Sequence, residues 1–118
     1  MPATYSKLKL SGSTNGKAIK LAATATPGTL VHTSVSGLVD YDEAWLYATN
    51  NHTGDVDLTI EWGGVASPDD IVEITIPAKT GLYLVIPGLV LQNGLIVRAF
   101  ASVTNVISVF GWVNRIEQ

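Results

Sequence analysis

Apolar and polar residues alternate most regularly along residues 55–62, DVDLTIEW. Every second residue from Val56 to Trp62 is apolar, and the residues between them are acidic or threonine. This period of two is typical of a β-strand with one buried face. Residues 43–50, EAWLYATN, precede this segment across a short polar connection that ends in Gly54. The two segments are therefore predicted to form a β-hairpin.

Similar short segments recur along the chain between turn signals. We expect strands at residues 18–24, 29–35, 71–76, 81–87, 95–101 and 106–113, with 89–94 as a link or a short strand. No segment repeats apolar residues at helical spacing over a useful length, so helix is expected only as a turn near residues 39–43. Turns spaced about eight to twelve residues apart predict an all-β protein, a single jelly-roll-like β-sandwich of about eight antiparallel strands.

The beginning of the chain is more polar than the rest. Residues 1–17 carry three lysines, among them Lys7 and Lys9, and they are expected to form a polar N-terminal arm. The arm leads into a β-sandwich domain of residues 18–118, and residues 4–10, TYSKLKL, have the composition of a short edge strand. No apolar core of the length that a secretory signal needs is found in it, so we expect the mature chain to begin at or near its first methionine.

Two of the predicted strands are apolar on both faces. In residues 44–48, Trp45 and Tyr47 alternate with alanine and leucine, and residues 82–86 place Tyr83 among leucine, valine and isoleucine. A two-layer sandwich covers only one face of each sheet, so the second face is predicted to contact another chain. The alternative is that the N-terminal arm or a long loop of the same chain folds over this face.

The longest apolar run, residues 81–101, contains a single charged side chain, Arg98. A transmembrane helix needs about 20 uninterrupted apolar residues. Pro87, Gly88 and the pair Asn93-Gly94 divide the run into short pieces, so it is read as strands and no membrane partner is predicted.

Composition narrows the functional classes further. The chain has 118 residues, which suits one domain, and it has no cysteine, which excludes disulfides, thiolate metal sites and a cysteine nucleophile. Its net charge is -3 and its seven basic residues are scattered, so no nucleic acid partner is predicted. Only 14% of the residues are charged, against about 25% in an average soluble domain. This shortage of charge predicts a homo-oligomer.

Acidic residues gather in two places. Asp55, Asp57 and Glu61 share one face of a predicted strand, but positions two apart on a strand are separated by about 7 Å, so a metal ion would need ligands from elsewhere. A solvated face is expected instead. The acidic residues in and after the loop of residues 63–70 lack the glycine-punctuated spacing of a calcium loop. Neither a metal nor a cofactor is predicted.

The histidines give no catalytic signal. His32 and His52 lack the spacing that favours zinc, and no Gly-x-Ser-x-Gly motif accompanies them. Residue types alone leave a Ser-His-Asp triad open, and a hydrolase would need a buried histidine–acid pair in a cleft. Both histidines are expected to be ordinary surface or turn residues, and the protein is not expected to be an enzyme.

The aromatic residues number nine, three Trp, four Tyr and two Phe. At strand spacing they are expected in the core or at an interface. The alternative is that some of them form a sugar-stacking platform, as in lectin-like sandwiches.

The C-terminal part of the chain resembles small structural proteins of tailed bacteriophages. In these β-sandwich modules a strand and a turn precede a Leu-x-Leu-x-x-Gly-x-x-Val-Arg-Ala sequence and a closing Val-x-Val-x-Gly-x-Val strand. The resemblance covers about residues 43–116. Its matching positions here are Leu89, Leu91, Gly94, Val97, Arg98, Ala99, Val109, Gly111 and Val113.

The resemblance implies a virion protein that is made in the host cytoplasm and then located on the outer surface of the phage head. Head decoration (cement) proteins, often trimers, are the best-known role of the family, and the expected partner is the major capsid protein or another virion protein. The alternative is a tail- or fibre-associated carbohydrate-binding module. Charges at the rim of the partner interface are expected at Lys7, Lys9 and Arg98, and buried anchors at Leu46, Tyr47 and Tyr83.

Overall fold

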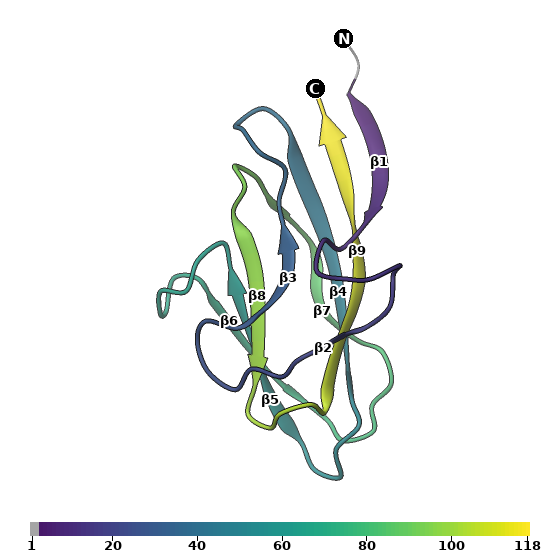
Figure 1. The fold of residues 1–118 in the computed structure, drawn as a ribbon, viewed down its shortest axis with the longest axis vertical. Helices are drawn as coiled ribbons and strands as arrows, with labels where there is room; N and C mark the ends of the chain where they lie inside the picture. Colours follow the sequence, from purple (N-terminus) through teal and green to yellow (C-terminus); the bar gives the residue numbers. More distant parts are fainter. Residues whose placement is uncertain (1–2) are drawn as a thin grey trace.

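The computed structural model describes residues 3–118, and within them it contains nine strands and no helix. Two antiparallel sheets pack face to face (Figure 1). Sheet A has the order β1-β9-β4-β7, with β2 also paired to β9, and sheet B has the order β3-β8-β5-β6. The strands are β1 (Thr4–Lys9), β2 (Ile19–Lys20), β3 (Thr29–Thr33), β4 (Tyr41–Asn50), β5 (Val56–Trp62), β6 (Ile71–Ile76), β7 (Tyr83–Leu91), β8 (Ile96–Ala101) and β9 (Ile107–Glu117).

The strand order is that of a jelly roll, which confirms the predicted all-β sandwich. Because β4 occupies one edge of β9 along most of its length, β1 and β2 both lie on the other edge and act as one interrupted strand. Counted in this way, four strands lie in each sheet, in the orders of a double Greek-key sandwich. Figure 1 shows that β1 begins and β9 ends at the same end of the molecule.

The core between the sheets is aliphatic. Its buried hydrophobic side chains are Leu, Ile, Val and Ala, contributed by both sheets, and none of the nine aromatic residues is among them. On β4 the burial alternates without interruption, so that Leu46 and its alanine neighbours face the core while Trp45 and Tyr47 face outward. The two-faced apolar pattern of residues 44–48 is therefore confirmed.

Several element boundaries differ from the predicted ones. The helical turn expected near residues 39–43 is absent, because Tyr41 already pairs with Ile116 at the start of β4. The strand expected at residues 18–24 is reduced to β2, since the chain then crosses from sheet A toward sheet B. Residues 81–87 and 89–94 merge into β7, and Gly88, with a φ of 82°, lets this strand continue past a proline.

The predicted N-terminal arm is joined to the sandwich. Residues 4–9 form β1, the expected edge strand, and pair with six residues of β9. Leu10, which follows β1, is buried in the core. Residues 1–2 of the arm lie outside the described residues. In the part of the chain that the structure describes, no helix is long and apolar enough to cross a membrane.

Candidate functional site

Four aromatic side chains share the outer face of sheet A. Trp45 and Tyr47 on β4 lie directly opposite Trp112 and Phe110 on β9, and direct cross-strand partners share a face. The ring centroids of Trp45 and Trp112 are 6.1 Å apart, and those of Tyr47 and Trp112 are 6.0 Å apart. All four side chains are half-buried. These four residues are hereafter the aromatic patch.

Strand β7 adds an apolar margin to the aromatic patch. Leu84 lies opposite Tyr47, Pro87 opposite Trp45, and Val90 opposite Glu43. Leu84 and Val90 are 43% and 55% exposed. The apolar surface of the aromatic patch therefore continues to the β7 edge of sheet A.

A glycine allows the indole of Trp45 to pack against the backbone of β7. A β-carbon at Gly88 would come within 2.9 Å of Cζ2 of Trp45, which is closer than real side chains approach. The positive φ of Gly88 also favours glycine at this position. Any residue larger than glycine at position 88 would therefore strain the backbone and displace the Trp45 ring.

The polar end of the aromatic patch is built around Glu43. Its Oε1 accepts a hydrogen bond from Asn114 Nδ2 at 2.9 Å and another from Trp45 Nε1 at 2.8 Å. The hydrogen bond from Asn114, followed by that from Trp45, lowers the pKa of Glu43 below its ordinary value. At the β1 side, the ammonium of Lys7 lies 4.7 Å from the ring centroid of Trp112, a cation–π contact.

The residues expected at a partner interface fall in different places. Tyr47 belongs to the aromatic patch, and Lys7 and Lys9 lie beside it on β1. The expectation that Leu46 anchors a partner is wrong. Its side chain points into the core and is 0% exposed, so it cannot contact a partner of the folded chain. Leu46 and Tyr47 are neighbours on β4 and belong to opposite apolar sets, so only one of the two predicted anchors can face outward.

Tyr83 and Arg98 lie away from the aromatic patch. Tyr83 starts β7 opposite the buried Ala48, and it is 36% exposed. Arg98 lies on β8 in sheet B, where its Nη1 contacts the carbonyl oxygen of Gly28 at 3.5 Å. The structure therefore brings three of the six expected interface residues, Lys7, Lys9 and Tyr47, to one face.

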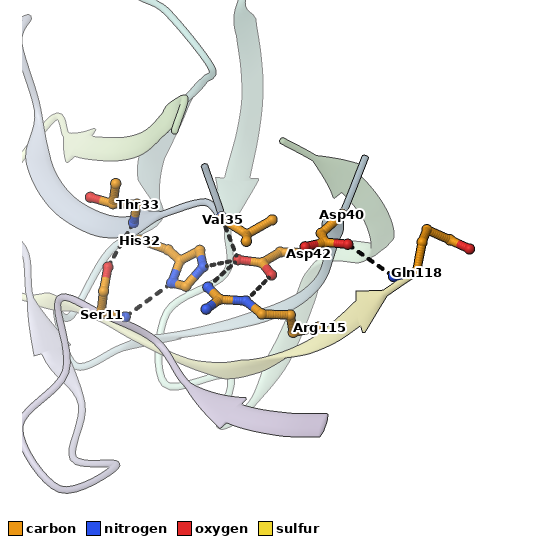
Figure 2. A network of polar contacts seen from close by, with 8 residues as sticks. All are labelled: Ser11, His32, Thr33, Val35, Asp40, Asp42, Arg115 and Gln118. Carbon is orange, nitrogen blue, oxygen red and sulfur yellow. Dashed lines mark hydrogen bonds and ion pairs between the residues drawn. The ribbon is translucent and has the colours of Figure 1, made fainter. Parts of the chain in front are cut away.

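A second group of polar residues connects β3, β4 and β9 in the interior (Figure 2). Arg115 donates to Asp42 through Nε at 2.8 Å and through Nη2 at 3.0 Å. His32 Nε2 lies 2.7 Å from Oδ2 of Asp42, and the amide of Val35 donates to the same oxygen at 3.2 Å. Both His32 and Asp42 are buried, so the expectation that His32 is a surface histidine is wrong.

Ser11, His32 and Asp42 have the residue types of a Ser-His-Asp triad, but their geometry is different. The amide N–H of Ser11 donates to Nδ1 of His32 at 3.0 Å, so the neutral imidazole carries its proton on Nε2 and donates it to Asp42. The hydroxyl oxygen of Ser11 accepts from the amide of Thr33 at 2.6 Å. In this arrangement the imidazole has no free nitrogen for the serine hydroxyl, and the network binds strands together.

The electrostatics of the network favour an ionised Asp42. Burial raises the pKa of Asp42, but the hydrogen bonds from Arg115 and His32 lower it more, so its pKa lies below the ordinary value. The hydrogen bond to Asp42 in turn raises the pKa of Arg115. The pair is therefore charged on both sides at neutral pH.

The acidic row of β5 is divided between two environments. Asp55 and Asp57 are exposed, as expected of a solvated face. The expectation of a solvated side chain is wrong for Glu61, which is only 1% exposed. Its carboxylate accepts hydrogen bonds from Thr26 Oγ1 at 2.5 Å and from the amide of Gly28 at 2.6 Å. It thus fixes the segment that crosses between the sheets. Among residues 3–118, no three His, Asp or Glu side chains converge closely enough to hold a metal ion.

Sequence reasoning missed several members of both sites. It expected Trp45, Phe110 and Trp112 in the core or at an interface, with a sugar-stacking platform as the alternative, but it did not group them. The pairing of β4 with β9 is what brings them together. It gave no role to Asp42 or Arg115, which are 73 residues apart in sequence and meet only through that pairing. His52 was placed correctly, in the turn after β4.

Comparisons with known proteins give no relative: no family model, no curated protein and no solved structure matches this chain.

Proposed function

We propose that the protein is a non-enzymatic virion structural protein that decorates the phage head. It would bind the assembled shell, through the major capsid protein or another virion protein, and stabilise it. The observation that carries the proposal is the aromatic patch with its apolar margin on the outer face of sheet A. The sequence resemblance supports the choice of a phage particle, and jelly rolls occur in capsid and lectin domains alike.

The aromatic patch suits a protein partner energetically. Trp and Tyr are enriched among the residues that dominate binding energy, and burying a large side chain contributes about 1.5–3 kcal/mol. A partner that binds only the assembled shell stabilises it by mass action. The contact is proposed to use the face of sheet A rather than its β7 edge, because Pro87 has no N–H to offer an added strand.

Co-sedimentation with phage heads that lack the decoration protein tests the proposal. The wild-type protein should pellet with the heads and raise their temperature of disruption. A Trp45→Ser/Tyr47→Ser variant should lose this binding, because two anchors of the aromatic patch are removed. Phe100→Ser is the matched control, since Phe100 is also a half-buried aromatic residue but lies on sheet B.

Two outcomes would count against this function. One is a wild-type protein that stays in the supernatant at every concentration tested. The other is equal binding by the wild type and the Trp45→Ser/Tyr47→Ser variant, provided that circular dichroism shows both to be folded. Light scattering of the unbound protein tests the separate prediction of a homo-oligomer, with a trimer expected.

A carbohydrate-binding module is the second candidate, and the polar end of the aromatic patch favours it. Trp45 and Trp112 are nearly parallel, with an angle of 12° between their planes, and the carboxylate of Glu43 lies beside them. Flat aromatic faces next to a carboxylate and an amide can stack on sugar rings and bind their hydroxyls. A glycan array combined with a calcium titration separates the two functions, since a decoration protein should bind no glycan.

A further inference from the structure

Three lysines line the β1 and β2 side of the aromatic patch. Lys7 lies opposite Asn114, Lys9 opposite Trp112, and Lys20 opposite Ser108, so all three share the outer face of sheet A. The exposed side chains of Lys7, Lys9 and Lys20 leave their ammonium groups accessible to a ligand. The contact of Lys7 with the Trp112 ring places one of these charges directly at the aromatic patch.

The charge on this face is opposite in sign to that of the whole protein. On the paired positions of its outer side, within the described residues, Glu43 is the one carboxylate facing the three lysines. Glu43 carries one negative charge against the three positive charges of the lysines, so the paired positions of this face are net positive. The chain as a whole carries a net charge of -3. Three of the seven basic residues of an acidic protein therefore share one face.

We propose that the outer face of sheet A binds an acidic surface of a partner protein, with carboxylates against the lysines and apolar residues against the aromatic patch and β7. This inference rests on the proposed decoration function and adds the chemistry of the partner. An apolar centre with charges at its rim is the usual anatomy of a protein–protein interface. The lysines would steer the encounter and fix its orientation.

Other occupants fit the face less well. A second copy of this chain would bring the same excess of positive charge to the contact, so like charges would oppose a face-to-face dimer. An anionic polysaccharide would satisfy the lysines, but it has little apolar surface to place against β7. The apolar margin on β7 would then remain uncovered.

The layout of the face also predicts how the partner lies. Lysines occupy the β1 and β2 side, the aromatic patch lies on β9 and β4, and Leu84 and Val90 lie on β7. The acidic residues of the partner should therefore meet β1 and β2, and its apolar residues should meet β7. Charge changes on the β1 and β2 side should therefore weaken binding, whereas charge changes on the β7 side should not.

Matched charge reversals test the inference. Lys9→Glu and Lys20→Glu each alter the lysine side, whereas Lys79→Glu makes the same change in net charge in the loop between β6 and β7. Both face variants should bind undecorated phage heads about two- to fivefold more weakly than the wild type, as expected for exposed charge pairs. Lys79→Glu should bind like the wild type. Added salt should weaken binding of the wild type more than that of Lys9→Glu.

A second probe makes the result independent of the phage head. Amide chemical shifts of the ¹⁵N-labelled protein are followed while a random copolymer of glutamate and tyrosine, an acidic and aromatic polypeptide, is added. The shifts should fall on β1, β4, β7 and β9 and should be reduced in Lys9→Glu. Dextran sulfate is titrated in parallel as an anionic polysaccharide, and light scattering reports self-association.

The outcomes separate this inference from the proposed function. If the heads bind the wild type and all three lysine variants equally, the inference is wrong although the decoration function stands. If the heads bind nothing but the copolymer maps to sheet A and Lys9→Glu weakens it, the inference stands and the function fails. Shifts elsewhere, stronger binding of dextran sulfate to the same face, or a dimer that covers the aromatic patch would each overturn the inference.

Discussion

Replacing Asp42 by asparagine should be among the most damaging changes of a single atom in this protein. Asp42 is 1% exposed, and its two oxygens accept four hydrogen bonds, two from Arg115 and one each from His32 and Val35. The amide of an asparagine offers one oxygen and two N–H groups in the same space. At least one of the present donors would then face another donor, and Arg115 would lose its counter-ion.

The expected cost follows from the exposure of the two partners. Removing one member of a buried ion pair typically costs 3–5 kcal/mol, because the other charge is left without compensation. Here Asp42 is buried but Arg115 is 26% exposed, so water can solvate part of the remaining charge. We therefore expect Asp42→Asn to lower the free energy of unfolding by about 3 kcal/mol at pH 7, the low end of that range.

The pH dependence of this loss identifies its cause. The folded pKa of Asp42 lies below its ordinary value of 3.8, so the carboxylate stabilises the fold above pH 3.8, and this contribution disappears as the pH falls through the folded pKa. The difference between the wild type and Asp42→Asn should be full at pH 7 and should shrink below pH 3.8. Urea denaturation followed by circular dichroism from pH 7 to pH 3 measures it.

Asp57→Asn is the control, because Asp57 is an exposed carboxylate whose side chain is bonded to Thr75 on the neighbouring strand. Its cost should stay below about 0.5 kcal/mol at any pH in the series. The reasoning is refuted if Asp42→Asn costs less than about 1 kcal/mol at pH 7, or if its cost is the same at pH 3 as at pH 7.

Three further substitutions test the packing, each by urea denaturation. Leu46→Ala should cost about 3 kcal/mol, because it leaves a cavity in the core, and a cost near zero would contradict the orientation of β4. Gly88→Ala should cost about 1–2 kcal/mol and shift the tryptophan fluorescence, since its β-carbon meets Trp45; unchanged emission would argue against that contact. Glu61→Gln should cost about 1 kcal/mol, unlike the same change at an exposed glutamate, because the hydrogen bonds with Gly28 and Thr26 lose the charge of the carboxylate.

The strands were predictable because their signals are local. Along residues 55–62 the side-chain period reports one buried face, and Asn93-Gly94 marks a turn in which both residues take positive φ. Boundaries that depend on distant partners were not predictable. The end of β2 is set by the crossing between sheets, and the last residues of β9 are strand because β1 pairs with them.

The candidate site was only partly predictable for a physical reason. On β4 the two alternating sets, Leu46 with alanines and Trp45 with Tyr47, are both apolar, so hydrophobicity cannot say which one faces the core. The sequence predicted two of the three lysines of this face, Lys7 and Lys9, at an interface, but not Lys20. Its place on the same face follows from pairing with β9, which sequence spacing does not encode.

The difference between the two outer faces supports docking through sheet A more than overall composition does. Aromatic side chains bury large areas and usually dominate a core, yet here the core is aliphatic and all nine aromatic residues keep some exposed surface. On sheet B, the outward positions include the polar pairs Asp57 with Thr75 and Thr59 with Glu73, and a single ring, Phe100, lies opposite Thr59. The corresponding pair on sheet A is Trp45 with Trp112. The rings of the aromatic patch stabilise sheet A by stacking on one another, and their remaining exposed surface is the apolar area that the proposed partner would cover.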